Sequence, residues 1–320
     1  MNLTKVEECL ERDVIQVLSR EDDCVVYQIS NETGEVIMTS YQVFPGIQII
    51  YNDVHIKKCS VIMESEHIGD NTFEINHCRE GRIECEVGGE FFYLTPGDMS
   101  INRKKNTGND SYFPTSHYHG VSVLVDPDLA PHCLSCILDD VNVQPASIVQ
   151  KFCGESESFI IRNNQHLEHI FHELYGLPQK IRKGYFKIKV LEILLFLGGT
   201  EFNQMGVRRK MYSQAQVTLA KQVCEFLSTH MEKHITIEYL SDIFHVSKTQ
   251  LKNCFKGVYG VSIYAYIRTQ KMQTAAILLK TTERTILDIA SQYGYHNASK
   301  FAKAFRDVMG VSPKQYRNEG

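Results

Sequence analysis

The sequence predicts an α+β chain in which a β-sandwich or barrel with flanking helices precedes an all-α C-terminal domain. Three observations lead to this fold class. Apolar and polar residues alternate in strand fashion from about Asp23 to Val125, and helical periodicity replaces that alternation from Asn163. The phrase FKGVYGVSIYAY at 255–266 returns as FRDVMGVSPKQY at 305–316. Such self-similarity at a fixed spacing indicates one supersecondary unit used twice.

Length and composition are those of a globular chain without a membrane span. The chain has 320 residues, of which 43% are hydrophobic and 22% charged, enough for two domains of ordinary size. No apolar run approaches the roughly 20 residues of a membrane-spanning helix. The N-terminus lacks the basic start and apolar core of a signal peptide, and ten cysteines without an export signal are typical of reduced thiols. We therefore expect a cytoplasmic protein.

The charge is divided unevenly along the chain. Residues 217–320 hold 14 Lys and Arg against 8 Asp and Glu, which leaves +6 (14 − 8). Residues 1–216 hold the other 20 against 30, which leaves −10 (20 − 30), for a net charge of −4. A basic C-terminal domain on an acidic body is the asymmetry expected when one end of a protein binds a polyanion such as nucleic acid.

The clearest strands lie in the segment EINHCREGRIECEVGGEFFYLTPGDMSI. Ile83, Cys85 and Val87 alternate with charged residues, and Gly88-Gly89 is typical of a hairpin turn before the returning strand. Many short strands with regular turns predict a sandwich or a barrel.

Two helices are predicted after the strands. Leu167, Ile170, Phe171 and Leu174 recur at helical spacing, and Gly176 ends that helix. The following segment, GYFKIKVLEILLFLGG, is apolar on more than one face. We therefore expect it to pack on the strands and also to form the seam of a homodimer.

The repeated phrase closes two predicted helix-turn-helix units. In the first unit, Thr236 caps a helix with an apolar stripe, and Ser247 caps the second helix. The stripe consists of Tyr239, Leu240 and Ile243. The second helix carries Leu251, Cys254 and Phe255 on its inner face and Thr249, Lys252, Asn253 and Lys256 on its outer face.

In the second unit, Thr285 caps the first helix, and Gly294 suits the left-handed residue that ends it. Asn297 or Ser299 opens the next helix. That helix directs Phe301, Ala304 and Phe305 inward and Ser299, Lys300, Lys303 and Arg306 outward. A helix-turn-helix suits DNA because its first helix braces the second at an angle that fits the major groove.

The segment from Tyr264 to Lys280 joins the two units and contains no Gly or Pro. We expect one continuous helix, about 25 Å long at 1.5 Å per residue. A helix of that length can hold two recognition helices roughly one DNA turn apart, about 34 Å, so that they enter successive major grooves. In the Gly-Val-Ser turns, Ser262 and Ser312 are interpreted as caps of the helices that follow.

Residues 217–320 resemble the C-terminal domain of AraC/XylS-type transcriptional regulators, and TILDIASQYGYHNASKFAKAFRDVMGVSPKQYR is similar to the signature of that family. The family usually has Arg at Lys271, Phe at Tyr295 and an aromatic residue at Lys300. The resemblance implies base contacts from Thr249, Lys252 and Asn253 in the first unit and from Ser299, Lys300 and Lys303 in the second. Lys256 and Arg306, one turn further on, are expected to contact phosphate.

The resemblance also implies a bacterial regulator with an N-terminal cupin-like jelly roll, whose cavity binds a small effector. We expect a cupin-like effector-sensing domain at 1–162, a helical dimerisation and packing segment at 163–199, a linker at 200–216 with Arg208, Arg209 and Lys210 free to touch DNA, and the double helix-turn-helix domain at 217–320. The expected partners are double-stranded promoter DNA, RNA polymerase, an effector that the sequence does not name, and a second copy of the chain.

Two alternatives remain open at this point. A metal-dependent cupin enzyme fused to a DNA-binding module would use a His-x-His pair such as His117 and His119, but no Glu follows within a turn. A thiol-redox switch would use Cys133 and Cys136, although a zinc site would need a second pair that is not near in sequence. We predict no catalytic residues, no metal ligands and no cofactor.

Overall fold

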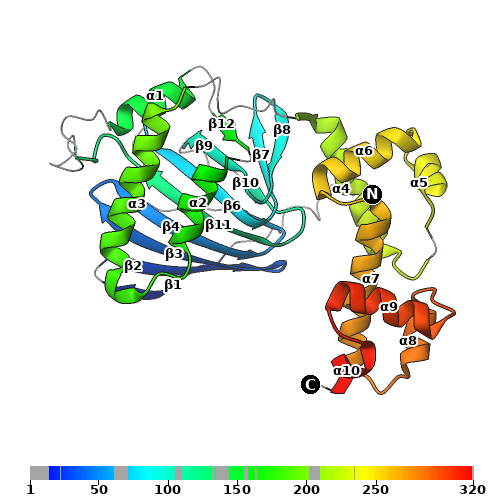
Figure 1. The fold of residues 1–320 in the computed structure, drawn as a ribbon. Coiled ribbons are helices and arrows are strands. Elements are labelled where there is room, and N and C mark those ends of the chain that lie inside the picture. The colour runs from blue at the N-terminus through cyan, green and yellow to red at the C-terminus, as the bar shows by residue number, and fades with distance from the viewer. Residues whose placement is uncertain are drawn as a thin grey trace, which may run out of the picture. The chain divides into compact units, whose positions relative to one another are not determined.

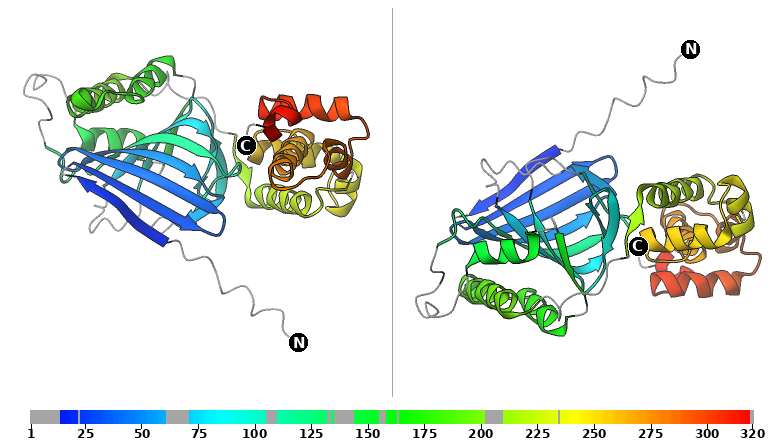
Figure 2. Two further views of the ribbon diagram at one scale, coloured as in Figure 1. Left: turned by 90° about the horizontal axis from the view of Figure 1, so that it is seen from below. Right: turned by 90° about the horizontal axis from the view of Figure 1, so that it is seen from above.

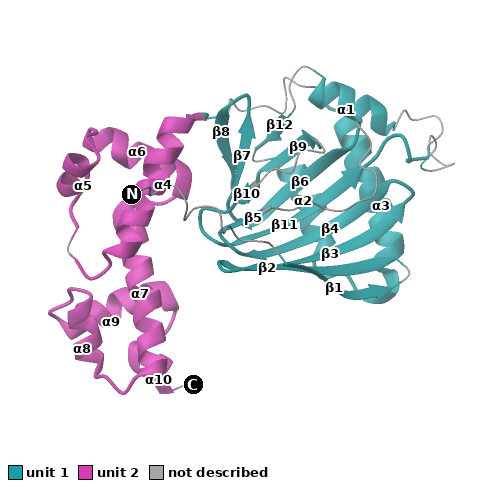
Figure 3. Cartoon of the chain, turned by 180° about the vertical axis from the view of Figure 1, so that it is seen from behind, with its two compact units in different colours: residues 1–211 teal, residues 212–320 magenta. Residues whose placement is uncertain are grey.

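In a computed structural model of the chain, the structure describes residues 14–21, 23–60, 71–104, 110–131, 134, 144–154, 158–162, 164–201, 210–233 and 235–318. The chain forms two compact units, residues 1–211 and residues 212–320 (Figure 3). Unit 1 is α+β, and unit 2 is helical apart from a two-residue strand, as the sequence predicts. The second unit begins five residues before the predicted start of the DNA-binding domain at 217.

The main sheet of unit 1 has eight antiparallel strands in the order β1-β2-β3-β4-β11-β6-β9-β12 (Figure 1). Their bounds are β1 (Val14–Glu21), β2 (Cys24–Asn31), β3 (Gly34–Phe44), β4 (Ile47–His55), β6 (Phe73–Gly81), β9 (Met99–Arg103), β11 (Tyr118–Val125) and β12 (Ser158–Ile161). Within the described residues, β1 and β12 are the edges of an open sheet. The predicted closed, cupin-like jelly roll is therefore not confirmed.

Two short strand pairs complete the β-structure of unit 1. They are β5 (Lys58–Ser60) with β10 (Asp110–Tyr112), and β7 (Ile83–Val87) with β8 (Glu90–Leu94). The turn of the second pair is the predicted Gly88-Gly89, whose φ angles of 60° and 80° fall in the region that favours glycine. This hairpin turn is confirmed because two successive positive φ angles match the twist of a two-residue β-turn.

Three helices cover one face of the large sheet (Figures 1 and 2). They are α1 (Pro145–Cys153), α2 (Gln165–Leu174) and α3 (Gln179–Gly199). The side chain of Asn164 caps α2 by accepting a hydrogen bond from the Leu167 amide at 3.1 Å. Between α2 and α3 the buried Lys189 pairs with Glu173 and with Glu192, the latter at 2.7 Å. This ion-pair network joins the two helices.

The alternation of side chains divides the sheet into two packed faces. On the helix face, by which we mean the face under α1–α3, Ile47 and Ile49 of β4 share a core with Phe171 of α2. On the opposite face, Ile50 and Val54 pack in a second core with the hairpin β7–β8. Each strand therefore has one set of residues for each face, two positions apart.

One buried histidine of the helix face has unusual surroundings. The His77 ring is stacked on Phe171 with centroids 4.6 Å apart and planes 5° apart. Neither of its ring nitrogens has a hydrogen-bond partner within the described residues. Burial lowers the pKa of His77 to about 4, because the apolar surroundings disfavour the charged ring.

Unit 2 consists of β13 (Tyr212–Ser213) followed by α4 (Gln214–Thr229), α5 (Ile237–Ile243), α6 (Lys248–Tyr259), α7 (Ile263–Thr281), α8 (Ile286–Gln292), α9 (Ala298–Met309) and α10 (Pro313–Asn318). The predicted connector is confirmed as the single helix α7, which runs between the two hairpins (Figure 1). At 1.5 Å per residue its 19 residues extend about 28 Å. None of the described helices is long and apolar enough to cross a membrane.

The predicted helix caps of unit 2 are confirmed. Thr236, Ser247, Ser262, Thr285, Asn297 and Ser312 each accept a hydrogen bond from an amide in the first turn of the helix that follows. Gly260 and Gly310 end α6 and α9 with the same left-handed φ of 78°. The two Gly-Val-Ser turns therefore have one structural role, which is to end one helix and to cap the next.

One apolar stripe of the first unit differs from the prediction. Leu240 of α5 is fully buried, but Tyr239 is 49% exposed and Ile243 is 37% exposed. Leu240 is thus the one buried residue among the seven of α5.

Candidate nucleic-acid interface

Helix α6 presents a polar face to solvent in the first unit. Its inward residues Leu251, Cys254 and Phe255 are at most 2% exposed. Thr249, Lys252, Asn253 and Lys256 all lie on the exposed side of α6. Their spacing of three or four residues places them on one side of the helix.

Helix α9 repeats this arrangement in the second unit. Phe301 and Phe305 are fully buried and Ala304 is 8% exposed. The exposed residues include Ser299, Lys300, Lys303 and Arg306. The sequence therefore predicts correctly which side of each helix faces solvent.

These eight outward side chains form no hydrogen bond or ion pair with any other described residue. By contrast, the neighbouring Lys248 at the start of α6 forms a 2.7 Å ion pair with Glu238 of α5. The hydrogen bond from Lys248 holds the pKa of Glu238 below its ordinary value. Lys248 thus joins the two helices of the hairpin, whereas the eight outward side chains keep their donors available for a ligand.

Lys271 is a buried cation that stabilises the end of a helix in unit 2. It lies on α7, is 9% exposed, and donates a hydrogen bond from Nζ to the backbone carbonyl of Tyr293 at 3.1 Å. Burial lowers the pKa of Lys271 because the site disfavours its positive charge. This cation caps the carboxyl end of α8, where the helix dipole favours a positive charge.

Several sequence predictions concern residues outside the described part of the chain. Arg208 and Arg209 of the predicted linker lie there, and so do Cys133 and Cys136 of the thiol alternative. Lys210, the third basic residue of the linker, is described and exposed.

Sequence reasoning missed a third histidine near His117 and His119. His55 lies on the neighbouring strand β4, and nitrogen atoms of the three rings lie within 4.8 Å of one another. The alternation of both segments indicates two strands, but it does not show that they are neighbours. The pairing of β4 with β11 joins residues more than sixty positions apart in the sequence. The composition of this cluster is that of a metal site, not of a nucleic-acid interface.

Comparison with known proteins identifies the second unit. Residues 240–319 match the model of a family described as a helix-turn-helix domain. An uncharacterised HTH-type transcriptional regulator of Staphylococcus aureus is 32% identical over 98 residues, which is 31% of this chain and 13% of that protein. The chain therefore spans only a small part of the length of the curated relatives that it matches.

Two solved structures are each similar to about a third of the chain. The C-terminal domain of AraT, a response regulator from Geobacillus stearothermophilus, is 31% identical over 32% of this chain and 85% of that chain, with a TM-score of 0.31. A probable AraC family transcriptional regulator from Rhodopseudomonas palustris is 27% identical over 32% of this chain and 96% of that chain, with a TM-score of 0.30.

These sequence matches define the second unit as a DNA-binding domain of the helix-turn-helix class. The second unit is thus similar to the helix-turn-helix domains of transcriptional regulators, which agrees with the AraC/XylS-type resemblance of its C-terminal sequence.

Proposed function

We propose that this chain regulates transcription by binding promoter DNA with α6 and α9 in two adjacent major grooves. The observation that carries this proposal is the set of eight outward side chains that form no hydrogen bond or ion pair with another described residue. Exposed cations and short polar groups on a braced helix suit both base edges and phosphates. On DNA the regulator would recruit or block RNA polymerase.

The outward residues divide into two expected roles. Thr249, Lys252 and Asn253 on α6, and Ser299, Lys300 and Lys303 on α9, are proposed to contact bases. Lys can donate to guanine O6 and N7, Asn can pair with adenine, and Ser or Thr can serve either. Lys256 and Arg306 lie one turn later and are proposed to contact phosphates.

Substitution of one lysine in each hairpin tests the base contacts. Lys252→Ala and Lys303→Ala should each weaken operator binding by about 1–3 kcal/mol, and each should relax sequence preference in its own half-site. The matched control is Lys180→Ala, which removes the same charge from an exposed site on α3 of unit 1. Full affinity for the operator in both variants, measured by fluorescence anisotropy at fixed salt, would disprove these assignments.

Salt dependence separates the phosphate contacts from the base contacts. Lys256→Ala and Arg306→Ala should weaken binding about equally for every DNA sequence. Each should reduce the slope of log K against log salt by about 1, because one fewer counterion is released. A change confined to particular base pairs would instead make these two residues readers of sequence.

Selection of random duplexes by the full-length protein tests the two-groove arrangement. Two short enriched blocks about one helical turn apart, roughly 10 base pairs, would support reading by both α6 and α9. One block would mean that a single hairpin reads sequence, and no enrichment would contradict unaided DNA recognition by this chain.

We also propose that unit 1 binds the effector on the face of its sheet opposite the helices. That face carries buried polar groups. Tyr118 donates a hydrogen bond to Asn76 Oδ1 at 2.6 Å, and Asn52 Nδ2 donates to Ser122 Oγ at 3.1 Å. Buried polar groups with defined partners suit the orientation of a small ligand. The expected result is that Asn76→Ala leaves basal operator affinity intact but removes its response to an activating compound.

A second copy of the chain is the proposed partner of α3. Ile181, Ile188 and Leu195 are 53%, 60% and 40% exposed, although α3 buries Val190, Ile193 and Leu194 against the sheet. Seven-residue spacing places the three exposed side chains on one stripe, which is the pattern of paired helices. Sedimentation should show a dimer that Ile188→Glu converts to a monomer. A wild-type monomer at micromolar concentration would contradict the dimer.

A further inference from the structure

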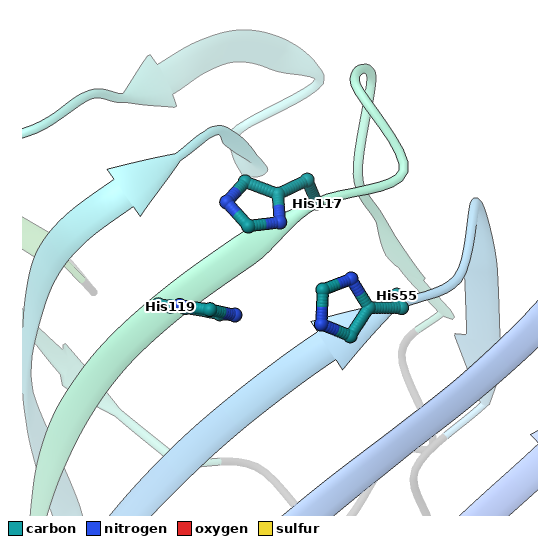
Figure 4. Close-up of side chains that lie close together, drawn as sticks. All are labelled: His55, His117 and His119. Carbon is teal, nitrogen blue, oxygen red and sulfur yellow. The ribbon is translucent and has the colours of Figure 1, made fainter. Parts of the chain in front are cut away.

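Three histidines of unit 1 meet on two neighbouring strands of the large sheet. His55 ends β4, His117 directly precedes β11, and His119 is the second residue of β11 (Figure 4). One nitrogen from each ring lies within 4.8 Å of the corresponding atoms of the other two. The ring centroids of His117 and His119 are 4.5 Å apart, and both lie within 5.4 Å of the His55 centroid.

The register of the sheet explains why the three rings share one face. Tyr118 of β11 is paired with Val54 of β4, and both belong to the core of the opposite face. The residues on either side of that pair therefore point to the helix face. The same face is covered by α2 further along the strands, where Tyr51 donates a hydrogen bond to the Leu174 carbonyl at 2.6 Å. The histidines lie beyond that cover.

Two carboxylates surround the histidines. Asp53 Oδ1 lies 2.9 Å from His55 Nε2 and 2.6 Å from His119 Nε2. Glu80 Oε2 on β6 lies 3.6 Å from His117 Nε2 and 3.9 Å from His119 Nδ1. The cluster thus joins three strands and combines three neutral ligands with two formal negative charges, which a divalent cation would balance.

The contact of His119 with Asp53 is short but does not satisfy the ring. Nε2 of His119 is buried and forms no hydrogen bond within the described residues, although Asp53 Oδ1 lies 2.6 Å away. A buried ring nitrogen without such a partner costs free energy unless another group contacts it. This atom therefore points to a ligand that the protein itself does not supply.

We propose that His55, His117 and His119 bind one divalent first-row transition-metal ion, with zinc as the reference. Imidazole nitrogens suit zinc, copper and nickel, whereas calcium and magnesium prefer oxygen ligands. Tetrahedral zinc with Zn–N bonds of 2.0–2.1 Å requires nitrogens about 3.3 Å apart. Small rotations of these rings reach that spacing, because their side chains are 53%, 38% and 31% exposed.

The carboxylates have a distinct part in this site. Asp53 Oδ1 contacts Nε2 of His55 and of His119, and His119 Nε2 is also the atom that points to the ion, so Asp53 lies beside the ion and offsets its positive charge. The fourth position of a tetrahedral ion would be open to water or to Glu80. The bound ion would join β4 to β11 and would stabilise unit 1 by its own binding free energy.

Binding of Zn²⁺ by full-length protein without a histidine tag tests the proposal. Isothermal titration in the presence of a competing chromophoric chelator should show one ion per chain with micromolar affinity or tighter. The substitutions His55→Ala, His117→Ala and His119→Ala should each weaken binding by about 100-fold or more, and Asp53→Asn by about 10- to 100-fold. Co²⁺ in the same site should show the visible absorption of a tetrahedral complex.

The control is His169→Ala combined with His172→Ala. These exposed histidines lie three residues apart on α2 and are not part of the His55, His117 and His119 cluster. The control variant should bind Zn²⁺ as the wild type does, and its melting temperature should rise on Zn²⁺ addition, as in the wild type. Loss of binding in the control with retention in the three single variants would overturn the proposal. Stoichiometric binding weaker than about 100 μM in the wild type would reduce it to adventitious coordination.

Discussion

The two helix-turn-helix units of this chain share more than a hairpin. In each unit a longer helix braces the pair, α4 in the first and α7 in the second. Their buried residues recur at one spacing, with Leu219, Ala220, Val223, Cys224 and Leu227 in α4 and Lys271, Met272, Ala275, Ala276 and Leu279 in α7. Helix α7 therefore has two structural roles, because it follows the first unit and forms part of the core of the second.

The units differ at two positions of this shared plan. Lys271 occupies the position that Leu219 has in the first unit, and both residues are only 9% exposed. After α5 the left-handed position is taken by His245 with φ of 52°, and after α8 it is taken by Gly294 with φ of 81°. Each unit therefore combines the shared plan with one less favourable choice, a buried cation in the second and a strained histidine in the first.

Among the substitutions that test this comparison, Ala275→Pro should have the largest effect on stability and on DNA binding. Ala275 is fully buried in the middle of α7, where proline removes a backbone hydrogen bond and clashes with the preceding turn. We expect unit 2 to lose about 3 kcal/mol or more of its free energy of unfolding, and tight operator binding to be lost with it. Urea denaturation and anisotropy on a two-block duplex measure the two effects.

The control for the proline variant is Ile277→Ala on the same helix. Ile277 is 61% exposed, so this change should alter the free energy of unfolding by less than about 0.5 kcal/mol. Tight binding of the two-block duplex by Ala275→Pro would show that α7 does not set the distance between the two hairpins.

A matched exchange at the left-handed positions should have a smaller effect. Gly294→Ala should destabilise unit 2 by about 1 kcal/mol, because a Cβ there meets no atom within 4 Å and the cost comes from the backbone alone. His245→Gly should stabilise it by up to about 1 kcal/mol for the same reason. Changes of opposite sign in the free energy of unfolding, measured by urea denaturation, would support the comparison. Destabilisation by both substitutions would mean that the His245 side chain contributes to the stability of the fold.

Lys271→Met should have the smallest effect at neutral pH, below about 1.5 kcal/mol, since one hydrogen bond is exchanged for apolar packing. The pH dependence is the sharper measurement. Burial lowers the pKa of Lys271 in the folded state, so the unfolded chain holds an extra proton between that pKa and about 10.5. Stability should therefore gain from rising pH in that window in the wild type, and Lys271→Met should lose this contribution. If the slope of the free energy of unfolding against pH were the same in both proteins, the charge of Lys271 would be exposed to solvent in the folded state.

The sequence was a reliable guide where structure depends on neighbouring residues. Caps such as Ser247 and Asn297, and the left-handed Gly294, act within one turn of chain, and the structure confirms each of them. The side of α6 and α9 that faces solvent was predicted for the same reason, because helical spacing is local.

Long-range pairing was less accessible to sequence reasoning. Whether the sheet is open or closed, and whether His55 approaches His117, depends on which strands become neighbours, and the alternation of side chains does not specify that order. The exposed Tyr239 has a related cause. Apolar residues at helical spacing indicate which side of α5 faces the core, but they do not indicate how much of that side the rest of the unit covers.

The stacked pair of His77 and Phe171 makes the stability of unit 1 depend on pH. The pKa of His77 lies near 4 in the folded chain and near 6.5 when the ring is in water. Between those two values the unfolded chain takes up a proton that the folded chain does not bind, so acid favours unfolding over that range. Because the ring lies directly against α2, acidification weakens the attachment of this helix to the sheet. At neutral pH the same ring is uncharged and packs as an aromatic hydrocarbon would.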